Sequence, residues 1–399
     1  MKIGIITFHF AENYGAVLQC YALQEYLKSR GHEVVIINYR PGYHTVQYRL
    51  LPSPVRIIRS LQGKNLRIQN RTLKAARETY FCLRDLIYVK RRYRKKKAFQ
   101  NFEKTYLNQS RRYTSFKELQ KKAPVCDIYI SGSDQLWNPV LTEGELDPAY
   151  FLDFGMDNSV RVTYAVSACQ LDGEKYADSL RRLLKRLDFI SLREYEKAEK
   201  IQVLSNKPVI INVDPTLLHN AYQYNRIRSR SETGKPYILL MLFSKNSQKI
   251  VNDILAEIKE EKKAEPLIFH PTVSNMKWNV PVIRTVGVGP DGYLDYIANA
   301  EFIITDSFHC TAFSIIYRKN FVTLSLEGKS SRMEELLMKL NLEERLIKTG
   351  EEILRASRAE IQYDRPQQYL HHLRNMTDVY FNQIENLSNE KKQESSQVL

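Results

Sequence analysis

The sequence predicts an α/β protein built from two similar halves. Short apolar, β-branched runs alternate with segments of helical spacing over residues 1–221, and the alternation returns over 222–385. The second half opens with a polar stretch rich in Arg and Ser, residues 222–235, which has the composition of a linker. At 399 residues the chain is long enough to give each half its own core. We therefore expect two Rossmann-like domains that face a cleft, and a disordered tail over 386–399.

The chain begins with a predicted β-α-β unit. Residues 2–8 and 33–38 are apolar runs typical of buried strands, and residues 16–30 between them have helical spacing. Two parallel strands joined by a helix should therefore open the N-terminal domain. The loop Asn13-Tyr14-Gly15 leads into the helix and is a candidate substrate-binding loop. Its single glycine does not match the dinucleotide-binding fingerprint.

A basic region from about 43 to 117 interrupts this alternation. Its pattern is helical rather than strand-like, and the run Lys90–Lys97 holds seven basic residues out of eight. We interpret the region as a basic helical insertion in the N-terminal domain. The run is either a solvated helix face or a patch that binds an anionic membrane surface. The net charge of +15 fits an anionic partner, but no nucleic-acid-binding motif is present, so nucleic acid is not expected.

Strands and helices alternate again after the insertion. The first domain should continue with strands at 127–131, 160–167, 189–192 and 208–213, and with helices at 174–186 and after residue 194. The second domain should hold strands at 236–243, 266–269, 282–286, 301–305 and 321–326, and helices at 247–262, 293–300, 308–316 and 331–340.

Several classes of protein are not indicated. The five cysteines are scattered without metal or redox spacing, so we expect no metal site, no disulfide framework and no cofactor. No apolar run approaches the ~20 residues that a membrane span needs, and the N-terminus lacks the features of a signal peptide. A cytoplasmic protein is expected.

Polar loops follow the predicted strands, and the most informative one joins a strand to a helix over residues 301–316. It contains Asp306, Ser307 and His309 at the start of the helix, where free N–H groups favour anions. The other loops hold Ser133-Asp134-Gln135, Arg193-Glu194, Asp214, and the pair Lys329 and Arg332. Ligands bind at the carboxyl ends of strands in such sheets, so we expect these loops to share a site. Asp214 precedes Pro215, which also suits a turn or a helix cap.

These loops resemble motifs of the polysaccharide pyruvyl transferase family, in the same order along the chain. The matching segments are Asn13-Tyr14-Gly15-Ala16 with Leu18-Gln19, Gly132-Ser133-Asp134-Gln135-Leu136-Trp137-Asn138, Ser191-Leu192-Arg193-Glu194, Asp214-Pro215, Asp306-Ser307-Phe308-His309-Cys310-Thr311-Ala312, and Ser330-Ser331-Arg332. The basic insertion lies outside them.

The resemblance implies a fold similar to the glycosyltransferase B type. It also implies transfer of a pyruvyl group from phosphoenolpyruvate to two hydroxyls of a sugar, which makes a cyclic ketal and needs no cofactor. His309 would be the acid/base and hold phosphate, Asp134 would activate an acceptor hydroxyl, and Arg193 would bind the donor. The remaining substrate-binding candidates are Arg332, Ser307, Lys329, Asn13, Tyr14, Gly15, Gln135 and Asp306.

One position departs from the family. Some members carry an arginine two residues before the histidine, where this chain has Ser307, so Arg332 or Lys329 would have to supply the missing phosphate contact. The expected acceptor is a hexose such as galactose on a polyprenyl diphosphate, which places the enzyme at the inner face of the cell membrane in bacterial surface polysaccharide biosynthesis. Two alternatives stay open: a glycosyltransferase that uses a nucleotide sugar, and a catalytically inactive binding protein.

Overall fold

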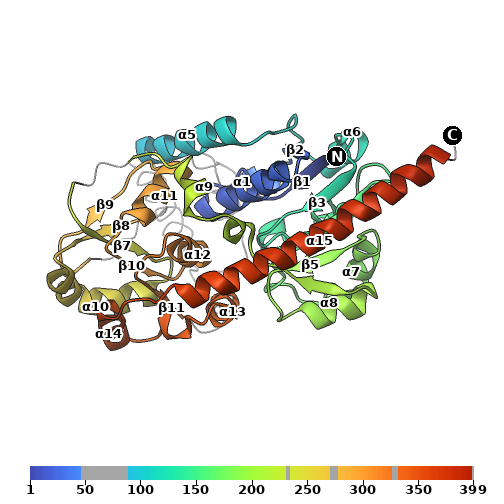
Figure 1. Cartoon of the computed structure of the whole chain (residues 1–399). Coiled ribbons are helices and arrows are strands. Elements are labelled where there is room, and N and C mark those ends of the chain that lie inside the picture. Colours follow the sequence, from blue (N-terminus) through green and yellow to red (C-terminus); the bar gives the residue numbers. More distant parts are fainter. Residues whose placement is uncertain (46–88, 231–233, 270–276, 326–330, 398–399) are drawn as a thin grey trace, which may run out of the picture.

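Two α/β domains, each built on parallel strands, lie side by side in the computed structural model (Figure 1). The structure describes residues 1–45, 89–230, 234–269, 277–325 and 331–397. Every strand pair in the three sheets is parallel, so helices make the crossovers and cover the sheet faces. The expected α/β class is confirmed, with parallel sheets in both halves of the chain.

The N-terminal domain has a four-stranded sheet in the order β2-β1-β3-β4 and a two-stranded sheet β5-β6. Single bridges from β4 to the segment around β5 bring the two sheets together. The strands are β1 (Lys2–Ile6), β2 (Glu33–Ile36), β3 (Ile128–Ser131), β4 (Val160–Thr163), β5 (Ile190–Leu192) and β6 (Val209–Ile211). The helices are α1 (Tyr14–Ser29), α2 (Gly42–Thr45), α5 (Val89–Tyr106), α6 (Phe116–Lys122), α7 (Ala177–Leu184), α8 (Ala198–Ser205) and α9 (Ala221–Asn225), with short 3-10 helices η2 (Pro139–Thr142), η3 (Pro148–Phe151) and η4 (Pro215–Leu218).

The C-terminal domain has one sheet in the order β12-β11-β10-β7-β8-β9. Its strands are β7 (Tyr237–Met241), β8 (Glu265–Ile268), β9 (Ile283–Arg284), β10 (Phe302–Thr305), β11 (Phe321–Leu324) and β12 (Leu346–Ile347). Its helices are α10 (Lys245–Lys262), α11 (Pro290–Ala298), α12 (Phe308–Ile316), α13 (Ser331–Lys339), α14 (Gly350–Arg358) and α15 (Asp364–Gln397), with the 3-10 helix η5 (Glu343–Arg345). The short strand β12 and the helix α6 were not predicted from the sequence.

The two domains share a hydrophobic core. One cluster of buried side chains runs from α1 and one face of the first sheet into α11, α12 and the second sheet. Tyr14 lies at this junction: its ring stacks on Tyr293 at 4.6 Å and 16°, and its hydroxyl donates to the Val288 carbonyl at 3.1 Å. Because α1 is buried on almost every side, its apolar residues do not follow a narrow stripe. Along α1 the domains are therefore in contact, and they do not face an open cleft there.

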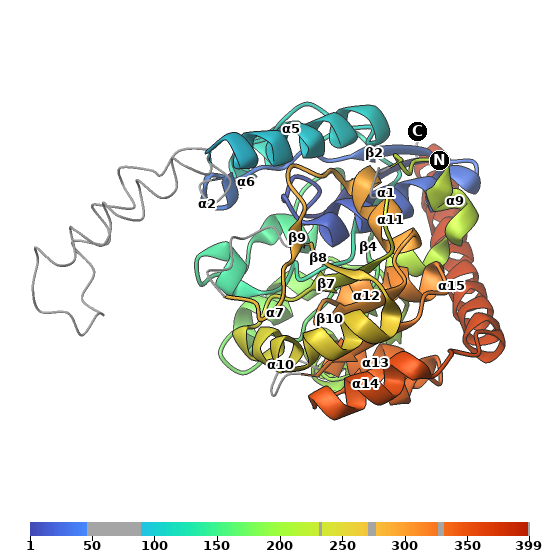
Figure 2. The same cartoon turned by 90° about the vertical axis from the view of Figure 1, so that its left-hand side faces the viewer.

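The basic run lies on α5, and this helix also joins the domains (Figure 2). Phe99 and Phe102 pack into the shared core. A Cβ on Gly287 of the C-terminal domain would lie 2.7 Å from the Cβ of Arg94, so only glycine permits this approach. Lys95 turns inward and donates to the Glu12 carbonyl at 2.7 Å. The insertion is thus helical over 89–106 as expected, and the rest of its predicted helix, 71–88, lies outside the described residues.

The predicted disordered tail is wrong over 386–397, because these residues complete helix α15. This helix crosses from the second domain to the first (Figure 1). Glu385 binds Arg30 at 2.8 Å, Lys391 binds Asp188 at 2.9 Å, and Tyr380 and Phe381 enter the shared core. The polar composition of the tail misled the prediction, since these contacts with a distant part of the chain stabilise the helix.

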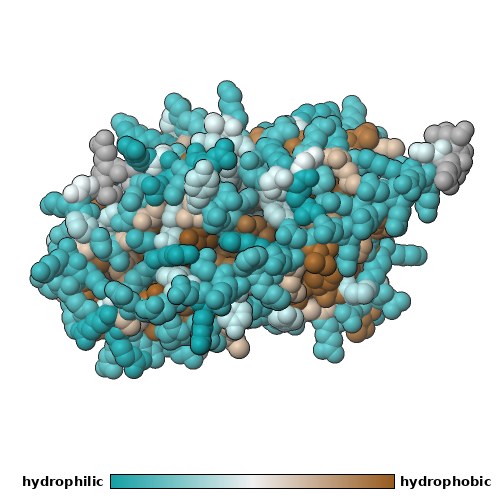
Figure 3. All heavy atoms as spheres, in the orientation of Figure 1, coloured by the Kyte–Doolittle hydropathy of each residue, from teal (hydrophilic) through white to brown (hydrophobic). Residues whose placement is uncertain are grey.

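The face drawn in Figure 3 is hydrophilic over most of its area, with apolar patches near the middle of the molecule. None of the helices in the described ranges combines the length and the hydropathy that crossing a bilayer requires.

A buried histidine gives the fold a testable dependence on pH. His44 packs edge-on against Phe8 and near Phe10, its Nε2 has no hydrogen-bond partner among the described residues, and burial lowers its pKa to about 4. In the unfolded chain a histidine titrates near 6.5, so only the unfolded state gains a proton as the pH falls from 6.5 to 4. Folding stability is therefore lost across this window.

We predict that His44→Phe removes the contribution of His44 to the fall in the free energy of unfolding between pH 6.5 and 4. This contribution is at most about 3 kcal/mol. The measurement is urea denaturation at several pH values between 4 and 7. His371→Gln, at an exposed position on α15, is the control and should keep the wild-type profile. Parallel curves for His44→Phe and the wild type would contradict the prediction.

Candidate active site

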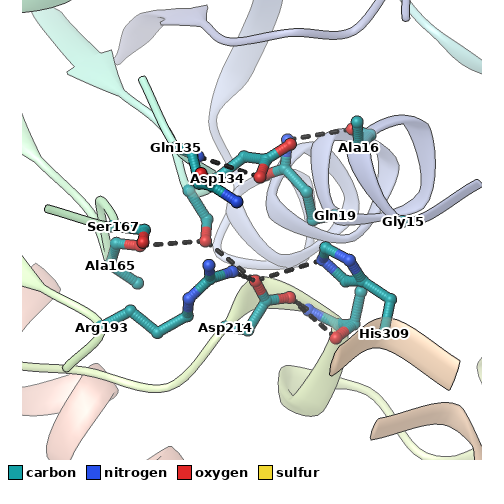
Figure 4. A network of polar contacts seen from close by, with 12 residues as sticks. Gly15, Ala16, Gln19, Asp134, Gln135, Ala165, Ser167, Arg193, Asp214 and His309 are labelled. Atoms are coloured by element: carbon teal, nitrogen blue, oxygen red, sulfur yellow. Dashed lines mark hydrogen bonds and ion pairs between the residues drawn. The ribbon is translucent and has the colours of Figure 1, made fainter. Parts of the chain in front are cut away.

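The carboxylate of Asp214 lies at the centre of the candidate site (Figure 4). Its Oδ1 accepts hydrogen bonds from the amide and the hydroxyl of Thr216, at 3.0 and 2.8 Å, and so caps η4. Its Oδ2 accepts from Ser133 Oγ at 2.9 Å and from Arg193 Nη1 at 2.8 Å. The same oxygen lies 3.6 Å from Nε2 of His309. The expected helix cap is confirmed, but it accounts for only one oxygen of the carboxylate.

Strand ends from both domains bring these groups together. Ser133 follows β3, Arg193 follows β5 and Asp214 follows β6, while His309 lies in the first turn of α12 behind β10. In parallel sheets the carboxyl ends of the strands share one edge, which is where ligands bind in such folds. The contact between His309 and Asp214 therefore joins the site edges of the two domains.

The ionisation of Asp214 and Arg193 depends on the charged groups around each of them. Burial by itself would raise the pKa of Asp214, but His309 and Arg193 outweigh it and hold that pKa well below its usual range. Burial likewise opposes the charge on Arg193, and Asp214 and Glu194 overcome it and raise the pKa of the guanidinium. The guanidinium also lies 4.4 Å above the ring of Phe308. Asp214 and Arg193 thus form a fully ionised buried pair.

Gly15 makes room for the imidazole of His309. A Cβ at this position would lie 2.0 Å from His309 Nδ1, a distance that no side chain permits. Asn13 caps α1 by accepting hydrogen bonds from the Gly15 and Ala16 amides, at 3.0 and 3.4 Å. The predicted loop 13–15 is therefore part of the site, and glycine is needed in it for close approach to the histidine.

The loop after β3 holds Asp134 in an unusual backbone conformation. Its φ is +90°, which favours glycine and costs an ordinary residue about 1–3 kcal/mol. The Asp134 carbonyl accepts from the Ser167 amide, and its Oδ1 accepts from the Gln135 amide, each at 2.9 Å. The charge of Asp134 also helps to raise the pKa of Arg193. Asp134 and Gln135 thus lie near Asp214, on the side of the site that the loop after β3 forms (Figure 4).

Two predicted substrate-binding residues are engaged in the fold instead. Tyr14 is buried in the domain interface, where its hydroxyl is bonded to Val288. Asp306 accepts hydrogen bonds from the Phe243 and Ser244 amides, at 2.8 and 2.9 Å, which ties β10 to the loop after β7. Both side chains therefore have structural roles, and their direct contact with a substrate stays a prediction.

The start of α12 is capped by Ser307, whose hydroxyl accepts from the Cys310 amide at 3.4 Å. This residue stands where some relatives are expected to have an arginine. Its hydroxyl therefore has a structural role at the start of the helix.

A hollow beside the centre contains the other predicted cation. Arg332 on α13 lines it together with Arg193, and the space, including the part open to solvent, is about 300 Å³. The Nε and Nη2 atoms of Arg193 are buried and have no hydrogen-bond partner in the described ranges. Lys329 lies outside the described residues. The hollow is lined by Arg193, Glu194, Val213, Asp214, Leu217, Phe308, Arg332, Glu335, Leu336 and Lys339.

The sequence analysis assigned no catalytic or binding role to Ser133, Glu194 or Asp214. All three lie in the loops that were singled out, but a carboxylate before proline and a serine after a strand also suit ordinary turns. Their clustering could be seen only when the strand ends were brought together.

The buried pair makes a stability prediction. Asp214→Asn keeps the shape of the side chain but leaves the Arg193 charge without its bonded counterion, which should cost about 3–5 kcal/mol of folding free energy. The matched control is Asp178→Asn, which breaks an ion pair with Arg181 of the same 2.8 Å length at the surface and should cost less than about 1 kcal/mol. Denaturant titration measures both, and equal losses would contradict the prediction.

Comparisons with known proteins place the chain in a family. The profile of the family described as "Polysaccharide pyruvyl transferase" matches residues 13–328. Solved structures with a similar outline include the UDP-GlcNAc 2-epimerase of Methanocaldococcus jannaschii in complex with UDP-GlcNAc and UDP (13% identity, TM-score 0.46, 94% of this chain and 99% of the other). They also include the Escherichia coli heptosyltransferase WaaC (12%, 0.35, 82% and 91%) and the glycosyltransferase SnogD of Streptomyces nogalater (9%, 0.40, 99% and 99%).

No curated protein sequence matches the chain. The solved structures are too distant to carry an argument about activity, so the assignment rests on the family match. This match covers most of the chain and the site loops from Asn13 to His309, but it ends before Arg332. This protein is a member of the polysaccharide pyruvyl transferase family.

Proposed function

We propose that the enzyme transfers a pyruvyl group from phosphoenolpyruvate to two hydroxyls of one sugar and forms a cyclic ketal. One observation carries most weight: the guanidinium of Arg193 is fixed by Asp214 yet keeps two buried nitrogens without partners. They lie beside an imidazole whose Nε2 is 3.6 Å from the same carboxylate. A buried donor without an acceptor costs free energy unless a ligand or water occupies it. An anionic donor substrate would accept from Nη2, since a guanidinium suits a carboxylate or phosphate oxygen.

The reaction needs an acid at carbon 3 of the donor. Protonation there by the imidazolium of His309 makes carbon 2 electrophilic, and a sugar hydroxyl attacks it. The second hydroxyl then forms its own bond to carbon 2 while the bond from carbon 2 to the phosphate oxygen breaks. Asp214 suits His309 to this task, because its carboxylate lies 3.6 Å from Nε2.

The other predicted residues keep their proposed roles. Arg332 would provide the phosphate contact that Ser307 cannot, since it lines the same hollow as Arg193. Asp134 remains the candidate for activating an acceptor hydroxyl from the strained loop after β3. Gly15 and Gln135 would bound the space around His309.

The proposed acceptor is a hexose on a polyprenyl diphosphate, and α5 would hold the enzyme at the membrane where such carriers lie. On this helix Lys90, Arg94 and Lys97 are exposed around the half-exposed ring of Tyr93, which is a combination that suits an anionic interface. Each basic residue near anionic lipid contributes roughly 1 kcal/mol. Lys95 is excluded from this surface because it points into the protein.

The function is tested by incubation with phosphoenolpyruvate and lipid-linked galactosides. Release of phosphate together with a pyruvate ketal on the acceptor, seen by mass spectrometry, is the expected result. Turnover of a nucleotide sugar without ketal would favour a glycosyltransferase, and no turnover of either donor would favour a binding protein.

We predict that His309→Ala lowers the rate of ketal formation by at least about 10²-fold, because it removes the general acid. The variant should keep its fold, since the bond between Arg193 and Asp214 remains. His371→Gln on the exposed face of α15 is the control and should retain full activity. A near-normal rate in a folded His309→Ala protein would show that the histidine is not catalytic.

Membrane binding has a separate test. Vesicles that contain anionic phospholipid should sediment the wild-type protein at low salt, and Lys90→Gln with Lys97→Gln should weaken this binding several-fold. The control pair is Lys245→Gln with Lys249→Gln, two exposed lysines on α10 away from α5 (Figure 1). Equal binding by both double variants would leave α5 as a solvated helix face.

A further inference from the structure

Glu194 is a buried carboxylate that the mechanism above does not use. It follows Arg193 at the end of β5, and its side chain is 1% exposed. Its Oε1 accepts hydrogen bonds from Ser167 Oγ at 2.5 Å and from the Cys169 amide at 3.1 Å. These two donors fix the direction of the carboxylate, so its other oxygen has one defined position beside the hollow.

That other oxygen, Oε2, has no hydrogen-bond partner within the described part of the chain. It lies 3.6 Å from Nε of Arg193, which also lacks a partner. This separation is too long for a good hydrogen bond between them, but one oxygen atom could lie within hydrogen-bond distance of both. A hydroxyl group fits such a position, because its hydrogen can be donated to the carboxylate while its oxygen accepts from the guanidinium.

The lining of the hollow indicates what carries this hydroxyl. It carries three basic and three acidic side chains, so nothing in its formal charge favours an anionic acceptor over a neutral one. Apolar side chains form the rest of the wall and suit the C–H faces of a sugar ring. The basic residues are Arg193, Arg332 and Lys339, the acidic ones are Glu194, Asp214 and Glu335, and the apolar ones are Val213, Leu217, Phe308 and Leu336.

We propose that Glu194, in place of Asp134, binds a hydroxyl of a neutral sugar acceptor and is the general base that deprotonates it, an inference that rests on the proposed pyruvyl transfer. In the first step the hydroxyl proton passes to Glu194 as its oxygen bonds to carbon 2, while His309 gives its proton to carbon 3. In the second step the proton on Glu194 goes to the departing phosphate, and the proton of the second hydroxyl returns to His309. Both residues are then restored, and one donor and one diol have become one ketal and one phosphate.

The test compares Glu194→Gln with the wild-type enzyme under saturating phosphoenolpyruvate. The amide keeps an oxygen for Ser167 and Cys169 but cannot take a proton, so kcat should fall by about 10²–10⁴-fold. Calorimetry should show unchanged affinity for phosphoenolpyruvate, and the fall of kcat/KM for the acceptor on the acid side of the pH profile should disappear. Glu174→Gln, at an exposed glutamate paired with Lys200, is the control and should leave all three measurements unchanged.

Several outcomes would overturn the proposal. A folded Glu194→Gln enzyme with near-normal kcat, or one that only loses affinity for phosphoenolpyruvate, would show that Glu194 positions Arg193 and is not the base. If the fall of kcat/KM on the acid side of the pH profile, the acid limb, disappears in Asp134→Asn and not in Glu194→Gln, Asp134 is the base. Should Glu194→Gln fail to fold, Glu194→Asp decides: a base requires a lower kcat with the acid limb retained. If the wild-type enzyme forms no ketal with any sugar, the proposed function itself fails, and this is known before any variant is compared.

Discussion

The buried carboxylate of Asp214 is the interaction on which the site depends. Removing a carboxylate from water costs free energy. Here the hydrogen bonds that Oδ2 accepts from Arg193 and Ser133 offset this desolvation, while Oδ1 caps the start of η4. Since these partners follow three different strands, the carboxylate fixes the relative positions of three loops. Its contact with His309 extends the same network into the other domain. The network thus brings together Arg193 and His309, the groups that would meet the donor.

The shared core gives this network its rigidity. Tyr14 packs against Tyr293 one residue before Gly15, so the contact between the domains and the contact between Gly15 and His309 are set by the same turn of α1. Helices α5 and α15 join the domains on other sides of the molecule (Figures 1 and 2). A catalytic group on one domain can therefore be held within about 0.5 Å of productive geometry relative to a base on the other, as efficient catalysis requires.

Much of the fold and part of the site could be predicted from the sequence. Period-two and apolar runs located the longer strands, and the strand-turn-helix pattern around His309 was correct in type and in place. Arg193 and His309 both lie beside the carboxylate of Asp214, as expected for residues that follow strand ends. The structural contacts of Tyr14 and Asp306 could not be predicted, because a polar group in a loop gives no sign of whether the fold already provides its hydrogen-bond partner. The end of α15 was misjudged because its stability comes from distant partners such as Arg30 and Asp188.

The sequence by itself determined the alternation of strands and helices, the family, and the identity of the groups able to carry charge and protons. These follow from local pattern and side-chain chemistry, which need no knowledge of distant neighbours. Only the tertiary structure decided which of those groups share a carboxylate, that Lys95 leaves the basic surface, and that Glu194 holds one oxygen without a partner. Burial and pairing depend on segments such as 193–194, 214 and 307–309 meeting in space, and the free energy of a buried charge is set by that meeting.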